Sequence, residues 1–433
     1  MFENSLEYAQ QLDLEDNLSH LRDRYSIPQQ KGCDIIYLCG NSLGLQPKVA
    51  KEYLLQELED WAMLGVEGHF KSNNPWFSYH EWFANPLANL VGAKPTEVVA
   101  MNNLTVNLHL LLVSFYQPKG KRNKILFEST AFPSDRYALE SQIHFHGLRP
   151  EDCLIELHTD SHGYISTESI LSKITEIGEE LACVMLGGVN YFTGQWFDLE
   201  KITQKAHEVG AIAGFDLAHA IGNVPMNLHQ WEVDFACWCS YKYLNSGPGA
   251  VAGIFVHEKF GDGSKLKRFH GWWGNNSKTR FKMGKEFKPS IGAEGWQLSN
   301  APVFNMVAHR AALEIFEEVG LNNLRRKSIL LTGYLEFLLL EINRLHQKDL
   351  IKILTPANSD ERGCQLSLKI STDGKNLFES MVKAGFLSDW REPDVIRISP
   401  VPMYNSFQEV WRTANFILEY FNSFYQRKTA STA

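Results

Sequence analysis

The sequence predicts an α/β fold: a large domain with a mostly parallel sheet flanked by helices, plus a smaller α+β domain. Two observations carry this prediction. From about residue 98, short apolar runs typical of buried strands alternate with helical stretches of about 10–12 residues, which is the pattern of βαβ units. After about residue 305, long helical periodicity is followed by an alternating strand and a closing amphipathic helix.

The elements of the large domain follow in order along the chain. Leu54, Leu58 and Trp61 recur at helical spacing and predict a helix over residues 49–64. Apolar runs predict further buried strands and helices. The strands are expected at residues 124–127, 153–157, 183–186, 211–216 and 233–239, and the helices at 106–115, 167–177 and 198–209.

The smaller domain begins with a strongly periodic helical region that runs to Leu345 and is broken at Gly320. Residues 365–370 alternate apolar and polar side chains, which predicts a half-exposed antiparallel strand. Ser406 and Glu409 have capping-box spacing and open a helix expected to end near Phe424.

Composition narrows the function. The chain has 433 residues and a net charge of −8, from 42 Lys and Arg against 50 Asp and Glu. This balance argues against a partner that is nucleic acid or an anionic membrane surface. No apolar run approaches the roughly 18 residues of a membrane span, and the N-terminus carries carboxylates where a secretory signal needs a basic end. With seven dispersed cysteines, we expect a cytoplasmic protein with reduced thiols.

The candidate chemistry lies at strand ends, because open parallel sheets bind ligands beyond the carboxyl ends of their strands. One predicted strand ends in Asp216, and the next leads into Lys242. Burial of either charge without a partner is costly. Pyridoxal 5'-phosphate calls for both, since a lysine holds it as a Schiff base and a carboxylate faces its pyridinium nitrogen. Thr105, just before a helix, could bind the phosphate, and Phe132 offers an aromatic face.

Each of these residues also has a plainer interpretation. Lys242 alone would be a solvated surface residue, and Asp216 a turn or cap residue. Cys237 and Cys239 are typical of small buried residues on one strand face. Asp216 and His219 have metal-ligand spacing, but no further ligand set accompanies them, so no metal site is expected. The joint placement at successive strand ends favours pyridoxal 5'-phosphate.

The chain resembles the kynureninase family, pyridoxal-phosphate enzymes with the aspartate aminotransferase fold (PLP-dependent transferase, fold type I). The block from Ala236 to Leu244 and the block from Arg397 to Asn405 are the most specific. The other matching blocks are residues 37–44, 103–109, 132–135, 216–219, 271–274 and 297–300. The resemblance implies hydrolysis of the β–γ carbon bond of L-kynurenine, or of its 3-hydroxy form. The products would be anthranilate, or 3-hydroxyanthranilate, and L-alanine.

The resemblance also implies roles. Lys242 would carry the cofactor, Asp216 would pair with its ring nitrogen, and Tyr241 would assist as a general base. The cofactor contacts implied are Leu104, Thr105, Phe132, Pro133, Ser134, Asp135, Asp216, His219, Tyr241, Lys242, Trp272 and Asn300. Arg397 would bind the substrate carboxylate, and His69 and Asn300 would contact its aromatic end. Some relatives carry a serine where this chain has Gly187, so a hydroxyl contact is expected to be missing or replaced by water.

Length alone suggests about three domains, whereas the pattern and the resemblance together favour two. We expect a large domain over residues 50–304 and a small domain formed by residues 1–49 with 305–433. The resemblance further implies a homodimer whose active sites use residues of both subunits.

Two alternatives stay open at this point. A desulfurase-like enzyme of the same fold would need a nucleophilic cysteine in the small domain. Cys364 is the candidate there, although its place in an alternating strand favours a packed core thiol. A protein that keeps the fold but only binds or regulates is the other alternative. The choice between kynurenine and 3-hydroxykynurenine depends on the shape of the pocket around His69 and Asn300.

Overall fold

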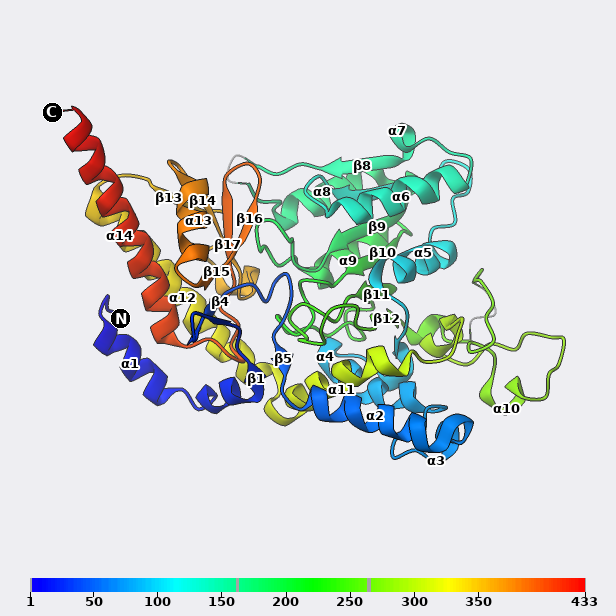
Figure 1. Ribbon diagram of the computed structural model, residues 1–433. Helices are drawn as coiled ribbons and strands as arrows, with labels where there is room; N and C mark the ends of the chain where they lie inside the picture. The colour runs from blue at the N-terminus through cyan, green and yellow to red at the C-terminus, as the bar shows by residue number, and fades with distance from the viewer. Residues whose placement is uncertain (1, 161–162, 263–265, 433) are drawn as a thin grey trace.

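A seven-stranded sheet forms the centre of the larger part of the chain. The computed structural model describes residues 2–160, 163–262 and 266–432, and the strand order is β6-β12-β11-β10-β9-β7-β8 (Figure 1). Strands β11, β10, β9, β7 and β8 are parallel, whereas β12 is antiparallel to both neighbours. A mostly parallel sheet is therefore confirmed. The strands are β6 Val98–Ala100, β7 Lys124–Glu128, β8 Leu154–Leu157, β9 Leu181–Gly187, β10 Ile212–Asp216, β11 Phe235–Trp238 and β12 Gly253–Val256.

Helices cover both faces of this sheet. Helices α5 Leu104–Phe115 and α6 Pro133–Phe145 pack on one face, and α8 Thr167–Ile177 and α9 Leu199–Glu208 on the other. Alternate strand residues enter the two cores because successive side chains of a strand point to opposite faces. In β7, for example, Leu126 packs with α8 and α9, and its two neighbours pack with α5 and α6.

A second, four-stranded antiparallel sheet lies apart from the first, on the left of Figure 1. Its strands, in spatial order, are β13 Ile351–Ile353, β14 Leu366–Ile370, β17 Val395–Ile398 and β16 Asp389–Arg391. The helices that share a core with it are α1 Leu6–Glu15, α12 Leu321–His346, α13 Gly374–Lys383 and α14 Phe407–Thr432. Helix α11 Val303–Val319 ends at Gly320, as predicted. The capping box of Ser406 and Glu409 is also confirmed, but α14 runs eight residues past the predicted end.

Residues 366–370 form an antiparallel strand, β14, as predicted, but the prediction that this strand is half-exposed is wrong. Strand β14 lies inside its sheet between β13 and β17, and in it only Lys369 is exposed. Of the polar residues that suggested exposure, Gln365 and Ser367 are buried, and the hydroxyl of Ser367 is satisfied there because it donates to the carbonyl of Phe192 at 2.6 Å. A satisfied buried serine gives the same sequence pattern as an exposed one.

The N-terminal residues contact the second sheet and its helices. Helix α1 packs on α14, and β4 Ile36–Tyr37 pairs in parallel with β15 Phe386–Leu387. Among the described residues, no helix combines the length and the apolar character needed to cross a bilayer. The remaining short elements are β1 Tyr25–Ser26, β2 Gln29–Gln30, β3 Cys33–Asp34, β5 Gln46–Pro47, α2 Ala50–Leu64, α3 Gly68–Lys71, α4 Ala84–Val91, α7 Pro150–Cys153 and α10 Ser277–Arg280.

Candidate active site

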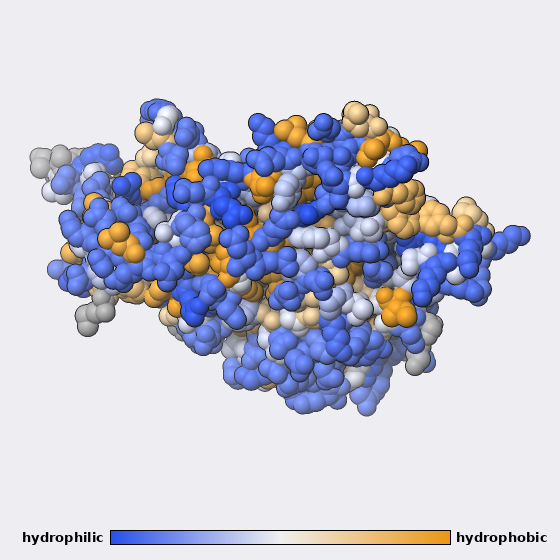
Figure 2. Space-filling model, turned by 90° about the horizontal axis from the view of Figure 1, so that it is seen from below, coloured by the Kyte–Doolittle hydropathy of each residue, from blue (hydrophilic) through white to orange (hydrophobic). Residues whose placement is uncertain are grey.

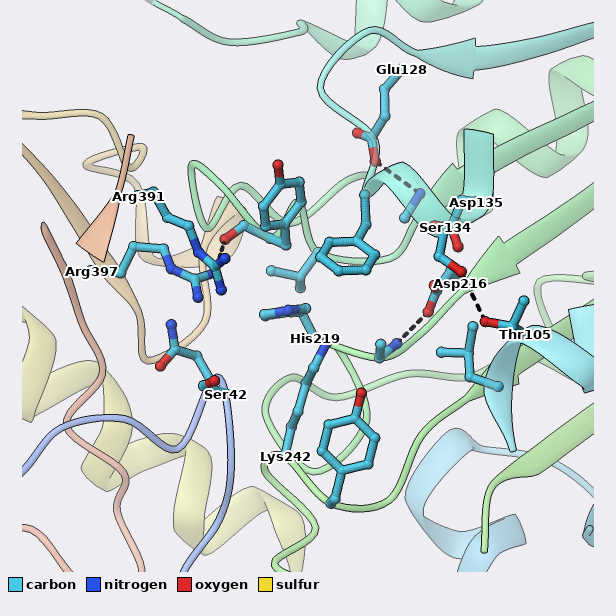
Figure 3. A pocket seen from close by; sticks show the side chains of 18 residues that line it. Ser42, Thr105, Glu128, Ser134, Asp135, Asp216, His219, Lys242, Arg391 and Arg397 are labelled. Atoms are coloured by element: carbon cyan, nitrogen blue, oxygen red, sulfur yellow. Dashed lines mark hydrogen bonds between the residues drawn. The ribbon is translucent and has the colours of Figure 1, made fainter. Parts of the chain in front are cut away.

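A cavity of about 260 Å³ lies at the carboxyl ends of the parallel strands. The last residues of three neighbouring strands line it: Glu128 of β7, Gly187 of β9 and Asp216 of β10. Its other lining residues are Asn41, Ser42, Leu104, Thr105, Phe132, Ser134, Asp135, Val189, Tyr191, Ala218, His219, Tyr241, Lys242, Arg391 and Arg397. In Figure 3, His219 and Lys242 lie between the two arginines at one end and Thr105, Ser134 and Asp135 at the other.

The lysine and the carboxylate predicted at strand ends do share this cavity. Asp216 is buried, and the backbone N–H of Ala218 donates to its Oδ1 at 2.7 Å. Lys242 follows β11, the neighbour of β10, and its Nζ has no hydrogen bond or ion pair within the described parts of the chain. The ammonium lies 5.9 Å from the ring centroids of both Phe132 and Tyr241. A lysine left available over aromatic rings is suited to form a covalent bond with a ligand.

Burial controls the charges around that lysine. Burial raises the pKa of Asp216, and Lys242 opposes the rise. The pKa of Asp135 is raised well above its ordinary value, first by burial and then by the charge of Asp216. Because the rise is larger for Asp135 and Lys242 opposes the rise for Asp216, Asp135 holds a proton more readily than Asp216 does. Burial and then the positive charge of Lys242 hold the pKa of His219 well below its usual range, so His219 is neutral.

Two helix N-termini meet at one end of the cavity. Helix α5 begins at Leu104 and α6 at Pro133, and the hydroxyls of Thr105 and Ser134 lie 2.9 Å apart there. The free N–H groups and positive dipole ends of two helices favour an anion. This arrangement, with two hydroxyl donors, fits a phosphate group.

Arg397 marks the opposite end. Its side chain is 1% exposed, and its Nη1 donates to the carbonyl of Tyr191 at 2.6 Å. Its Nε and Nη2 face the carboxylate of Asp389 at 3.1 and 2.8 Å. A buried, oriented guanidinium is suited to bind a carboxylate through two parallel hydrogen bonds.

Comparison with known proteins agrees with this geometry. A family model described as the kynureninase C-terminal domain matches residues 324–417. The chain is 53% identical to a kynureninase from Flavobacterium psychrophilum over 412 residues, which covers 95% of this chain and 97% of that protein. It is 47% identical to a kynureninase from Nematostella vectensis, covering 94% and 92% of the two chains.

The chain belongs to the kynureninase family.

Solved structures resemble it in fold. A cysteine desulfurase from Escherichia coli superposes with a TM-score of 0.74 at 15% identity, covering 93% of this chain and 97% of that one. A C-DES variant with glycine linked covalently to its PLP cofactor has a TM-score of 0.71 at 16% identity, with 88% and 97% covered. These likenesses confirm the predicted fold class.

The desulfurase alternative has no nucleophile at the position that suggested it. Cys364 is 1% exposed, and its Sγ lies 3.5 Å from the hydroxyl of Ser399. Burial raises the pKa of this thiol to about 11, so the thiolate is scarce at neutral pH. Cys364 packs as a core residue in this member of the kynureninase family.

Three of the residues expected at the active site of a kynureninase lie elsewhere in the chain. His69, Trp272 and Asn300 line a separate apolar hollow of about 580 Å³ and do not line the cavity of Lys242. Trp76, Phe77 and other aromatic side chains form most of its wall. Pro133 is the first residue of α6, between two residues that line the cavity. The other expected residues are brought together there: Leu104, Thr105, Phe132, Ser134, Asp135, Asp216, His219, Tyr241, Lys242 and Arg397.

Sequence reasoning missed several residues of the cavity wall, among them Glu128, Tyr191 and Arg391. Glu128 ends a predicted strand, so the strand-end rule could have found it. Arg391 lies two residues from Asp389 on β16, and the alternation of that short strand offers only a weak signal. Tyr191 lies in the loop after β9 and has no local pattern that would mark it.

Proposed function

We propose that this kynureninase-family protein holds pyridoxal 5'-phosphate on Lys242 and hydrolyses L-kynurenine, or 3-hydroxy-L-kynurenine. The products are anthranilate, or 3-hydroxyanthranilate, and L-alanine. The observation that carries the proposal is the placement of Lys242 and Asp216 at neighbouring strand ends, with Arg397 at the far end of the same cavity. Relatives named kynureninase, about half identical over nearly the whole chain, support the activity.

The residues fit the cofactor. Within the described residues, Asp135 Oδ1 and His219 Nδ1 are buried without a hydrogen-bond partner. A buried polar atom without a partner is costly, and polar groups of a bound ligand would relieve that cost. Lys242 would hold the aldehyde carbon, Asp216 the ring nitrogen, Phe132 one ring face, and Thr105 with Ser134 the phosphate. When bound, the cofactor would supply an electron sink for the α-carbon of the amino acid.

The chain's own groups would move the protons. Once the substrate amine had released it, Lys242 would act as the base that accepts the α-proton, because it is the one lysine among the described residues that line the cavity. Asp216 would keep the ring nitrogen of the bound cofactor protonated, since the N–H of Ala218 stabilises the negative charge of this carboxylate. Arg397 holds the substrate carboxylate and so fixes which bond at the α-carbon faces Lys242.

Tyr241 enters this scheme in its protonated form. Burial is the largest cause of a raised pKa for this phenol, and the neighbouring Cys239 adds to the rise. Tyr241 can therefore donate a proton or a hydrogen bond, and it accepts a proton from water only when a strong acceptor such as the phosphate takes its own. We assign it the water-addition step on that condition.

We further propose a homodimer. On α2 the apolar stripe Leu54, Leu58 and Trp61 is 40%, 42% and 58% exposed, while Glu57 and Asp60 face inward. Apolar side chains that face solvent along one helix favour a protein interface. Figure 2 views the molecule from the side where α2 and α3 lie in Figure 1, and orange apolar side chains break its hydrophilic surface.

The hollow that contains His69 and Asn300 continues this apolar surface, since Trp61 lines it too. A partner copy that covers α2 could bring its own His69, Trp272 and Asn300 to the cavity of this chain. The aromatic end of the substrate would then be selected by residues of the partner. The shape of that joint pocket decides between kynurenine and its 3-hydroxy form.

We also propose a cytoplasmic location and a role in the kynurenine pathway, either in tryptophan breakdown or in supply of an NAD precursor. The net charge of −8 and the seven unpaired cysteines support the location.

The test is direct. Purified protein loaded with pyridoxal 5'-phosphate, of verified cofactor content, is incubated with L-kynurenine and with 3-hydroxy-L-kynurenine. The expected result is the fluorescence of anthranilate or 3-hydroxyanthranilate, and the ratio of kcat/KM values identifies the preferred substrate. Loaded protein that forms neither product would rule the proposal out.

A further inference from the structure

The carboxylate end of the cavity contains a second arginine that the proposed reaction does not use. Arg391 and Arg397 both line the cavity and lie next to each other in Figure 3. Arg397 is 1% exposed in its side chain and Arg391 35%. Two guanidinium groups at one end of a small cavity repel each other unless a negative charge lies between them.

Asp389 supplies that charge. Its carboxylate contacts Arg391 through Oδ1 at 3.0 Å and Arg397 through Oδ2 at 2.8 Å. The fold enforces the contact: Asp389 of β16 pairs directly with Arg397 of β17, and Arg391 pairs with Val395. Residues two apart share a face of a strand, and so do paired residues, so all three side chains project from one face of the sheet.

The hydrogen bonds of Arg397 leave some N–H groups of its guanidinium free to bind a ligand. Nε donates to Asp389, Nη2 faces the second oxygen of Asp389, and Nη1 donates to the carbonyl of Tyr191. Guanidinium has five N–H groups. Nη2 makes no hydrogen bond within the described residues despite its approach to Asp389, so both of its N–H groups and one N–H of Nη1 have no hydrogen-bond partner there. These N–H groups can bind one carboxylate.

The charges of this cluster give it a preference. Two guanidinium groups and one carboxylate leave a net charge of one positive unit, which a substrate with a single carboxylate neutralises. A ligand with a second carboxylate in this part of the cavity would place two negative charges against that one unit. Removal of the charge of Asp389 would raise the local charge to two units and reverse the preference.

We propose that Asp389 is a positioning and specificity-determining residue: it orients Arg397 and limits this end of the cavity to ligands with one carboxylate. This inference rests on the proposed function for the identity of the substrate, but it concerns a residue that does not touch the substrate.

The experiment compares L-aspartate with L-asparagine, which have nearly the same size and differ in one negative charge. Holoprotein loaded with pyridoxal 5'-phosphate is titrated with each amino acid, and binding is followed by the change in cofactor absorbance. The same ligands are then tested as inhibitors of anthranilate formation. The variants are Asp389→Asn, Asp389→Glu, Arg391→Gln and the double variant Asp389→Asn with Arg391→Gln.

In wild type, asparagine should bind at least as tightly as aspartate. Asp389→Asn should shift the affinity ratio toward aspartate by about tenfold. It should also raise the KM for kynurenine by about tenfold, with a smaller change in kcat, because the orientation of Arg397 is lost. Asp389→Glu should restore the wild-type ratio. The double variant, which again has one net positive charge, should also bind aspartate no better than asparagine.

An unchanged aspartate-to-asparagine ratio in Asp389→Asn would overturn the inference, as would a shift that persists in the double variant. If Asp389→Asn does not fold, Arg391→Gln alone decides the test. This variant leaves Arg397 and Asp389 with no net charge, so the KM for kynurenine must rise. An unchanged KM would overturn the inference. The absorbance titration needs no turnover. A wild type that binds both amino acids but forms no anthranilate would therefore contradict the proposed function and leave this test intact.

Discussion

Arg397 shows how one buried side chain sets the geometry of the proposed reaction. Replacement of Arg397 by Lys keeps the charge but loses the planar fork, since an ammonium cannot form two parallel hydrogen bonds to a carboxylate. We predict that Arg397→Lys raises the KM for kynurenine by at least about tenfold, with a smaller loss in kcat. Steady-state kinetics measure both constants.

Arg344→Lys is the matched control, because Arg344 is exposed on α12 and its ion pair with Glu341 lies at the surface. This control should keep wild-type kinetics. Equal KM values for Arg397→Lys and wild type would remove Arg397 from the substrate site.

Glu128 gives a second prediction at the residue scale. It is buried at the end of β7, accepts hydrogen bonds from the N–H of Gly187 and the amide of Asn190, and burial raises its pKa from 4.5 to about 7. Between about pH 4.5 and 7, the folded apoprotein therefore keeps a proton on Glu128 that the unfolded chain has already released. The native state binds more protons, so this group lowers the free energy of unfolding as pH rises through that window.

Glu128→Gln removes the titration and mimics the protonated form. From pH 5 to pH 8 the stability of the variant relative to wild type should increase, by up to about 3 kcal/mol. Urea unfolding of both apoproteins at each pH measures the difference. Stability curves that stay parallel across this range would show that Glu128 titrates alike in the folded and unfolded chains.

Several residues of the cavity could be predicted from sequence and others could not. Asp216 and Lys242 are predictable because ligands bind beyond the carboxyl ends of parallel strands, and the strands themselves can be recognised in the sequence. Glu128, the last residue of β7, follows from the same reasoning. Arg391 comes from a different sheet, so its place in the cavity depends on how the two sheets pack. Gly187 has a reason within the first sheet: a Cβ there would meet Oε1 of Glu128, on the neighbouring strand β7, at 2.9 Å, so the Glu128 side chain would have to shift.

At the scale of elements, the sequence predicts the helix α2 but does not predict which of its faces lies against the core. Leu54, Leu58 and Trp61 correctly predict the helix, but a periodic apolar stripe is expected to face the core of its own chain. Here the inward side carries Glu57, which accepts a hydrogen bond from the indole of Trp76 at 2.7 Å. Sequence periodicity shows which residues share a helix face and does not show which surface that face contacts.

That inversion leads to a prediction. Leu58→Glu places a charge in the proposed interface, where its desolvation opposes association. We predict that the variant sediments as a monomer at concentrations where wild type is a dimer, and that it loses at least about tenfold in kcat/KM. The loss follows because the partner no longer supplies His69 and Asn300.

Leu340→Glu serves as the control, since Leu340 is 52% exposed on α12, outside the stripe. It should sediment and react like wild type. A monomeric but fully active Leu58→Glu variant would refute a site shared between subunits, and a monomeric wild type would refute the dimer.

At the scale of the whole molecule, net charge and local charge act separately. The −8 total does not describe the cavity, where two arginines lie at one end and two helix N-termini at the other. Such local fields suit an amino-acid carboxylate and a phosphate. Composition could predict which partners to exclude, but only the packing of two sheets around one cavity shows which anions can bind. The division into residues 50–304 and residues 1–49 with 305–433 stays a prediction.

The cavity around Lys242 is where we propose that kynurenine is hydrolysed. The most direct measurement is the product stoichiometry of the loaded wild type and of Lys242→Ala, with L-alanine and anthranilate both quantified. The prediction is one L-alanine and one anthranilate for each kynurenine consumed by wild type, and a loss of at least about 1,000-fold in rate for Lys242→Ala. Wild-type turnover retained by Lys242→Ala, or kynurenine consumed without equal amounts of both products, would contradict it.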